Sequence, residues 1–290
     1  MRFNSNQIKK IEKEISSRVD GKTLFDEFSR GRYSTDASVY QIKPLGVVLP
    51  KDTNDVLNIM DYSQKNSIPL LARGGGSSQC GQTVGESVVL DYSRHQNKIL
   101  ELNVEEKYVW VQPGVVLDHL NSYLKPYGLW FPVDVSTSSR ATIGGMSANN
   151  SCGSRSLYYG NMVHNVLAIE AILDDGSLHT FDQIKKNYLA TTNNQDRFYK
   201  IIDKFVNLRQ QVSKDIDENW PTTQRRVGGY NIDLIDPNGF NSSNLLVGSE
   251  GTLTLFNKIK LKLSDIPKNK ILGVCSVSYT HLRAHETIQH

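Results

Sequence analysis

The sequence has few cysteines and no long apolar run, and these two shortages exclude several classes of protein. Its three cysteines, Cys80, Cys152 and Cys275, lie far apart in the chain. Such a set forms neither a disulfide framework nor a CxxC metal or cluster site. No apolar segment approaches the roughly 20 residues of a membrane span, and residues 1–18 lack the apolar core of a signal peptide. We expect a cytosolic protein, with at most a peripheral attachment at the inner face of the membrane.

An excess of either charge is also missing. Lysine and arginine number 33 against 30 aspartates and glutamates, which gives a formal net charge of +3. Without a dense basic block, a nucleic-acid partner is disfavoured. Hydrophobic residues make up 38% of the 290 residues, so we expect a packed globular chain with one large domain or two subdomains.

The first part of the chain predicts a helix and then a β-α-β unit. Ile8, Ile11 and Ile15 recur at helical spacing, and we assign residues 1–38 to an N-terminal helical segment. Residues 45–49 and 69–72 have the pattern of short strands, and between them Asp52 or Thr53 can cap a helix. Residues 88–90 add a further strand.

The rest predicts mainly antiparallel strands. Residues 99–103 and 108–112 form a strand pair, and residues 166–173 and 178–181 form a hairpin whose Asp-Gly pair favours a type I′ turn. A helix carries Leu117, Leu120 and Leu124, and residues 252–263 form a last strand. A second, longer helix starts near Asp196. Its predicted core stripe consists of Phe198, Ile201, Ile202, Phe205, Leu208 and Val212. The fold class is α+β, with a small βαβ subdomain and a larger antiparallel sheet flanked by helices, in one domain over residues 39–265.

A glycine-rich loop directly follows the second strand. Arg73 is followed by Gly74, Gly75, Gly76, Ser77 and Ser78. Backbone N–H groups without Cβ atoms around them can converge on an anion. The loop lacks the Gly-Lys-Ser/Thr of a P-loop, and Gly81 and Gly85 interrupt the place where a Rossmann helix would start. A tight structural turn and a phosphate cradle both remain open.

Two further tracts favour the cradle. Residues 132–153 are polar and punctuated by glycine, and residues 248–251 (Gly-Ser-Glu-Gly) follow an apolar strand pattern. Backbone and hydroxyl donors at this density suit a long phosphate-bearing ligand.

These motifs together resemble the flavin-binding module of vanillyl-alcohol-oxidase-type flavoproteins, the PCMH-type FAD-binding fold. The resemblance rests on residues 73–78 with Gly81 and Gln82, on 111–114, on 141–153 and on 248–251, and it covers residues 30–268. It is nearest to the branch of D-lactate and D-2-hydroxyglutarate dehydrogenases. Residues 31–38 and 226–230 resemble the long bacterial members that carry an iron–sulfur region after the flavoprotein part.

The resemblance implies which residues hold FAD. The pyrophosphate would lie on Arg73, Gly74, Gly75, Gly76, Ser77 and Ser78. Other expected contacts are Gly81, Gln82, Pro132, Ser136, Thr137, Thr142, Gly144, Gly145, Ala148, Asn149, Ser151, Gly153, Glu250 and Gly251. Val166 would contact the adenine through its backbone. Some relatives have a flavin-linked histidine where this chain has Ser78, so we expect noncovalent FAD.

Other reactive residue types in the sequence have ordinary explanations. The scattered histidines suit surface or packing roles, and Cys152 suits a small packing residue. Asp134 and Glu250 do not form a credible acid–base pair, so the catalytic residues stay unassigned.

The end of the sequence departs from the family pattern. Relatives continue into a cap domain that binds substrate, and we interpret residues 266–290 as a truncated start of that domain. From about Ser276 we expect the tail to be foreign to the fold, with His281 and His285 too isolated for a metal site. An iron–sulfur cluster would require sequence beyond this chain.

The resemblance implies a module that oxidises a D-2-hydroxy acid of the D-lactate or D-2-hydroxyglutarate type. A hydride would pass from substrate C2 to flavin N5, and a base from the cap would take the hydroxyl proton. The electrons would leave to a quinone, a cytochrome or an iron–sulfur region. Two alternatives remain: a non-catalytic flavin-binding fragment or subunit, and a non-redox flavin-dependent transferase.

Overall fold

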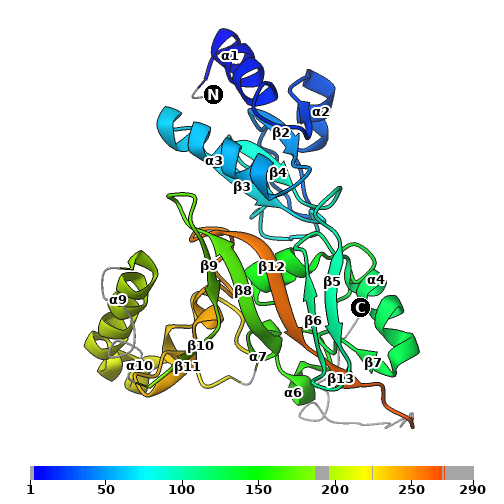
Figure 1. Ribbon diagram of the computed structural model, residues 1–290, viewed down its shortest axis with the longest axis vertical. Coiled ribbons are helices and arrows are strands. Elements are labelled where there is room, and N and C mark those ends of the chain that lie inside the picture. Colours follow the sequence, from blue (N-terminus) through cyan, green and yellow to red (C-terminus); the bar gives the residue numbers. More distant parts are fainter. Residues whose placement is uncertain (1–2, 187–195, 224, 270, 272–290) are drawn as a thin grey trace, which may run out of the picture.

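The computed structural model describes residues 3–186, 196–223, 225–269 and 271. A smaller sheet with its helices forms the upper part in Figure 1, and a larger antiparallel sheet forms the lower part. The predicted α+β class with two sheets is confirmed. Most of the predicted start of the cap domain, from residue 272 on, and the tail from about Ser276 lie outside the described residues.

The smaller sheet has the strand order β1-β2-β4-β3. Strands β2, β4 and β3 run parallel, and β1 pairs antiparallel with β2. Three apolar residues of the first helix, Ile8, Ile11 and Ile15, are buried in the core of this unit. The elements are α1 (Ser5–Ser16), β1 (Lys22–Leu24), α2 (Glu27–Arg32), β2 (Gly46–Leu49), α3 (Thr53–Asn66), β3 (Leu70–Arg73) and β4 (Val88–Asp91).

The larger sheet has the order β5-β6-β12-β8-β9 and is antiparallel throughout. Its central strand comes last in the sequence, so the chain returns to complete the sheet. The strands are β5 (Ile99–Asn103), β6 (Tyr108–Val111), β8 (Val166–Ile172), β9 (Leu178–Phe181) and β12 (Leu255–Lys262). β12 extends beyond β6, because its pairing with β6 begins only at Ile259.

Short helices and two small strand pairs surround this sheet. The helices are α4 (Leu117–Leu124), η1 (Lys125–Tyr127), α5 (Ile143–Asn149), α6 (Ser156–Tyr159), α7 (Met162–Asn165), α9 (Arg197–Gln211), α10 (Ser213–Asn219), η2 (Ile232–Leu234) and η3 (Ser242–Leu245). The pairs join β7 (Leu129–Trp130) to β13 (Ser264–Asp265) and β10 (Gln183–Lys185) to β11 (Gly239–Asn241).

Two local predictions were wrong. In the β8–β9 turn only Gly176 has a positive φ, and its N–H donates to the carbonyl of Leu173. A type I′ turn needs positive φ at two residues, so this is a type I turn followed by a glycine bulge. In α9, Val206 is buried with Phe198 and Ile202, whereas Leu208 is 42% exposed. The buried stripe is therefore rotated from the predicted one.

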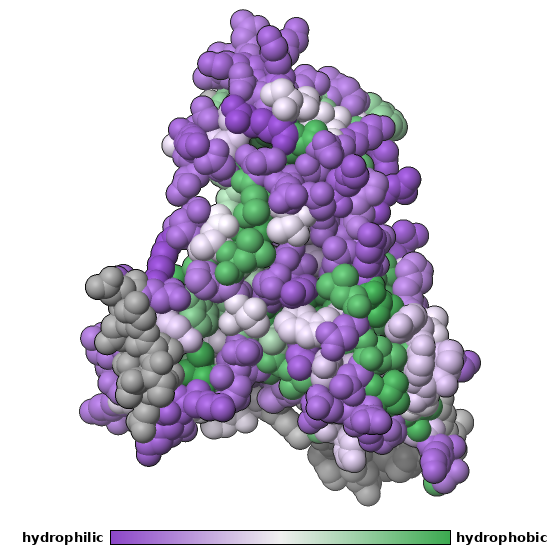
Figure 2. All heavy atoms as spheres, in the orientation of Figure 1, coloured by the Kyte–Doolittle hydropathy of each residue, from purple (hydrophilic) through white to green (hydrophobic). Residues whose placement is uncertain are grey.

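The two sheets share apolar contacts where β12 begins. Leu255 and Ile172 belong to the larger sheet, yet both pack into the core of the smaller unit beside Tyr92. The surface in the view of Figure 2 is largely hydrophilic, with apolar residues reaching it in patches at this junction and on the lower part. Within the described chain, every helix is too short or too polar to cross a bilayer.

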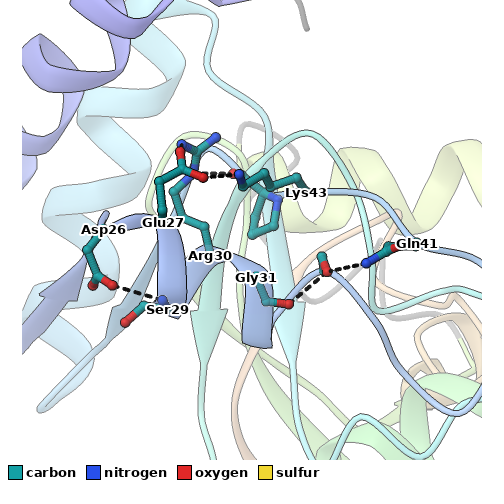
Figure 3. Close-up of polar contacts among 9 residues, drawn as sticks. Asp26, Glu27, Ser29, Arg30, Gly31, Gln41 and Lys43 are labelled. Carbon is teal, nitrogen blue, oxygen red and sulfur yellow. Dashed lines mark hydrogen bonds and ion pairs between the residues drawn. The ribbon is translucent and has the colours of Figure 1, made fainter.

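A polar network fixes the segment that follows α2 (Figure 3). Asp26 caps the helix by accepting the N–H of Ser29 at 2.9 Å. Arg30 donates to the carbonyl of Pro44 at 2.8 Å and pairs with Glu27, which Lys43 also contacts. This network closes residues 33–44 into a fixed loop beside the smaller sheet.

Asp55 fastens the start of α3 to the turn before β1. Its buried carboxylate accepts the backbone N–H groups of Asp20 at 2.8 Å, Gly21 at 2.9 Å and Lys51 at 2.7 Å. We expect Asp55→Ala to lower the free energy of unfolding by about 1–3 kcal/mol, because three partly buried N–H donors lose their acceptor. Chemical denaturation measures this. Asp61→Ala on the same helix is the control, since Asp61 is exposed and only pairs with Lys65. Equal losses of unfolding free energy in both variants would contradict the role of Asp55 as the acceptor that fastens α3.

Candidate functional site

A cavity of about 460 Å³ lies at the junction of the two sheets. One wall is the loop after β3, and the opposite wall is formed by α5 and the residues on either side of it. Glu250, Gly251 and Thr254, which precede β12, and Phe256 within β12 form a third wall. The three sequence tracts that predicted a ligand site therefore meet in one place.

The glycines of these loops are required by close packing. A Cβ on Gly74 would lie 2.0 Å from Thr142 Oγ1, and one on Gly75 would lie 2.2 Å from the carbonyl oxygen of Arg140. A Cβ on Gly144 would lie 2.5 Å from the Cβ of Pro113. Gly76 has φ +63°, which disfavours other residues. The glycine loop, residues 73–79, thus lies directly against the start of α5.

The glycine loop presents a run of unused backbone donors. Among the described residues, no hydrogen bond is formed by the backbone N–H groups of residues 74–79, and these residues line the cavity. Consecutive unpaired N–H groups beside a cavity suit an anion. By contrast, the first N–H groups of α5 are already used. Ile143 donates to Val115, Gly144 to Pro113 and Gly145 to the Thr142 hydroxyl.

Arg73 holds the glycine loop in place through hydrogen bonds of its side chain. Its guanidinium donates to the carbonyl of Thr35 at 2.8 Å, of Thr83 at 3.1 Å and of Tyr33 at 3.3 Å. Burial lowers the pKa of Arg73, while the nearby carboxylates of Asp91 and Asp36 oppose that shift. Arg73 is therefore a structural contact between the glycine loop and the segment after α2.

The polar wall opposite is cross-linked by side chains. Asn149 donates to Glu250 Oε1 at 3.1 Å, and Ser151 donates to Asn149 Oδ1 at 3.0 Å. The N–H of Glu250 also donates to the carbonyl of Ala148 at 2.9 Å, and Glu250 adopts φ +53°. These contacts hold the turn before β12 against the end of α5. Asp134 contacts Ser154 and the N–H of Arg155 instead, so it does not pair with Glu250.

Most of the predicted site residues line this cavity. Those that do are Arg73, Gly74, Gly75, Gly76, Ser77, Ser78, Gln82, Ser136, Thr137, Thr142, Gly144, Gly145, Ala148, Asn149, Ser151, Glu250 and Gly251. Gly81, Pro132, Gly153 and Val166 do not. Gly153 packs against Asp134, where a Cβ would lie 2.0 Å from its carbonyl oxygen. The Val166 carbonyl already accepts from Asn241 at 3.0 Å.

Several cavity residues were not predicted from the sequence. Tyr92, Thr254, Phe256 and Cys80 line it. Pro113 and Cys152 line it as well, and they lie within the motifs at 111–114 and 141–153 on which the resemblance rests. Tyr92 directly follows β4, Thr254 directly precedes β12 and Phe256 lies within β12, in stretches without a glycine signature. Within β12, Phe256 lines the cavity, and the contact of Val166 with adenine that the resemblance implies stays a prediction.

Comparison with known proteins agrees with this geometry. Residues 44–182 match the family described as FAD binding domain. This part of the chain is an FAD-binding domain. It includes the glycine loop and all of α5, and the remaining cavity wall comes from the turn before β12.

Proteins of similar sequence carry dehydrogenase names. The chain is 34% identical over 290 residues to the D-2-hydroxyglutarate dehydrogenase of Haemophilus influenzae, covering 93% of this chain and 28% of that protein. It is 35% identical over 258 residues to the Escherichia coli protein of the same name, covering 86% and 25%. The chain thus spans about a quarter of the length of these curated relatives.

The fold also matches solved structures. An alkyldihydroxyacetonephosphate synthase superimposes with a TM-score of 0.63 at 17% identity, over 90% of this chain and 44% of that one. At this identity the likeness concerns the fold alone.

The cavity fits FAD on its own geometry. The unpaired N–H groups of residues 74–79 suit a diphosphate, since phosphate oxygens accept several charge-assisted hydrogen bonds at once. Around them, hydroxyl and amide side chains at Ser136, Thr137, Asn149 and Ser151 suit a polyhydroxyl chain.

Gly145 provides a test of ligand contact that leaves the fold intact. It lies in the first turn of α5 and lines the cavity, and an added Cβ would have only Thr142 Oγ1 nearby, at 3.3 Å. We expect Gly145→Ala to change the melting temperature little without flavin, since the preference of alanine for a helix, about 0.5–1 kcal/mol, offsets the tight contact with Thr142 Oγ1. FAD affinity should fall, because the methyl group occupies cavity space.

Gly31→Ala in α2 is the matched control, because a Cβ there meets no atom within 4 Å and Gly31 does not line the cavity. Fluorescence titration with FAD compares the two variants. Equal FAD affinity in both would show that Gly145 does not face the ligand. Gly75→Val is unsuitable for this purpose, because its Cβ would collide with Arg140 whether or not a ligand is bound.

Acid precipitation can test whether the flavin is bound covalently or noncovalently. The Ser78 hydroxyl bonds to the side chain of Gln82 and offers no group for a flavin bond. We expect acid precipitation to release all flavin into the supernatant, as measured by its absorbance. Yellow colour remaining with the polypeptide would contradict noncovalent binding, and its loss in Cys152→Ser would identify the anchor.

Proposed function

We propose that this chain is the FAD-holding part of an oxidoreductase that oxidises a D-2-hydroxy acid of the D-2-hydroxyglutarate type. The observation that carries the proposal is the run of unpaired N–H groups at residues 74–79, inside a domain of the FAD-binding family. The named dehydrogenases at about one-third identity support the substrate class.

Bound FAD supplies the two-electron acceptor for such a reaction. The chain's own residues hold and orient it. The N–H groups of the glycine loop would bind the pyrophosphate, with Ser136 and Thr137 near the ribityl chain. The Asn149–Glu250 contact keeps the turn before β12 in place.

We assign no catalytic base among the described residues. His164 accepts the N–H of Asn161 at 3.0 Å, and burial lowers its pKa, so it acts as a helix cap. We place the base and the substrate's carboxylate-binding groups in the length of the relatives that this chain does not span. A quinone, a cytochrome or an iron–sulfur region is the proposed electron acceptor, and the cytosol the proposed location.

A chimera tests this function. This chain would replace the matching quarter of the Haemophilus influenzae relative, and the purified protein would be mixed anaerobically with D-2-hydroxyglutarate. We expect flavin absorbance to bleach with the D-isomer and to persist with the L-isomer, while the FAD-loaded chain alone stays oxidised for minutes. A chimera that binds flavin but is reduced by neither D-2-hydroxyglutarate nor D-lactate would contradict the proposal. Rapid bleaching of the chain alone would show that the substrate groups lie within it.

A further inference from the structure

An exposed row of aromatic side chains lies on α6, outside the cavity. Tyr158 is 85% exposed and Leu157 is 54% exposed. The ring of Tyr158 contacts that of Tyr159 edge to face at a centroid distance of 4.8 Å, and Tyr159 contacts Trp130 in the same way at 5.4 Å. The guanidinium carbon of Arg155 lies 4.7 Å from the centre of the Trp130 ring. We call Trp130, Arg155, Leu157, Tyr158 and Tyr159 the α6 row.

The α6 row has the composition and order of a binding surface. Single exposed apolar side chains are common, whereas adjoining ones mark contact sites. Tryptophan, tyrosine and arginine are the residue types that contribute most to the binding energy of protein interfaces. Here the edge-to-face ring contacts and the cation–π contact hold these side chains in place before any partner binds. This order lowers the conformational entropy that docking would cost.

The α6 row also lies where the chain leaves the larger sheet. After β12, the short strand β13 pairs with β7, and the indole N–H of Trp130 donates to the carbonyl of Asp265 at 3.1 Å. The next residue, Ile266, donates its N–H to the carbonyl of Gly128 at 2.8 Å. Figure 1 shows α6 and β13 together at the lower edge of the molecule. Polypeptide that continues from β13 therefore starts beside Trp130.

The segment before α6 leads to the cavity. Cys152 lines the cavity and is followed by Arg155 only three residues later. The backbone N–H of Arg155 donates to Asp134 Oδ1 at 3.1 Å, and the residue after Asp134, Val135, also lines the cavity. A domain docked on the α6 row would therefore border this end of the cavity.

We propose that the α6 row is the docking surface for the substrate-binding part of the protein, which we place in the length of the relatives that this chain does not span. The chain covers 28% and 25% of two such relatives, so most of their length lies outside this domain. The complementary surface is apolar and carries a carboxylate for Arg155. This inference rests on the proposed function. It adds where the two parts meet, at the Cys152 end of the cavity.

Hydroxyl-radical footprinting with mass spectrometry tests the docking, in this chain and in its chimera with the Haemophilus influenzae relative. We expect labelling of Leu157 and Tyr158 to fall about fivefold or more in the chimera, because side chains at the centre of an interface lose their contact with water. Phe28 is the internal control, since it is 75% exposed on α2 of the smaller unit and should be labelled equally in both proteins. Equal labelling of Tyr158 in both proteins overturns the inference.

A double substitution separates docking from folding. Leu157→Ser combined with Tyr158→Ser should leave the melting temperature and the FAD affinity of this chain unchanged, since both side chains are exposed. In the chimera the same change should slow flavin reduction by D-2-hydroxyglutarate about tenfold or more, as expected for the loss of an interface anchor. Phe28→Ser is the matched control and should alter neither protein. Weaker FAD binding by the doubly substituted chain alone would show that the α6 row supports the cavity itself, and would overturn the docking role.

The docking surface and the proposed function fail in different ways. A chimera that protects Tyr158 but is reduced by neither hydroxy acid supports the docking and contradicts the function, whereas reduction without protection overturns the docking alone. If the joined chimera does not fold, its two portions are co-expressed as separate chains. Co-purification that the double substitution abolishes supports the inference. Association that the double substitution leaves intact, or no association at all, overturns it.

Discussion

The site depends on keeping consecutive backbone N–H groups unpaired beside a cavity. Such groups normally find partners in helices or sheets, and here close packing prevents it. Gly74 and Gly75 lie so near to Thr142 and Arg140 that a Cβ would not fit, and the loop therefore follows the wall of its neighbour. Its donors at residues 74–79 stay free for a ligand.

The rest of the structure holds this loop in place from three directions. Arg73 ties it to the carbonyls of Tyr33 and Thr35 in the segment after α2. The start of α5 satisfies its own first N–H groups through Pro113 and Val115, so it serves as a support. The turn at Glu250 is fastened to Ala148. Each contact joins segments far apart in the sequence, and for this reason the site forms only when both sheets do.

Periodicity and glycine patterns were enough to predict most of the fold. The Ile8–Ile11–Ile15 spacing located α1. The prediction that Asp52 or Thr53 caps a helix located the start of α3, and the structure has Asp52 as the cap. The glycine tracts located the cavity walls. Tertiary packing limits what the sequence can predict. Gly176 forms a bulge because Asp175 keeps a negative φ. Tyr92 and Thr254 reach the cavity only because one sheet packs against the other. No local pattern marks such residues, because their neighbours come from distant parts of the chain.

Amide hydrogen exchange tests the central claim most directly. Exchange at individual residues would be followed by NMR in the full chain, with and without FAD. The account predicts rapid exchange at residues 74–79 in the free protein and strong protection there once FAD is bound, with little change at Ile143 and Gly144, whose N–H groups are already bonded. Unchanged exchange at residues 74–79 in a protein saturated with FAD would contradict it.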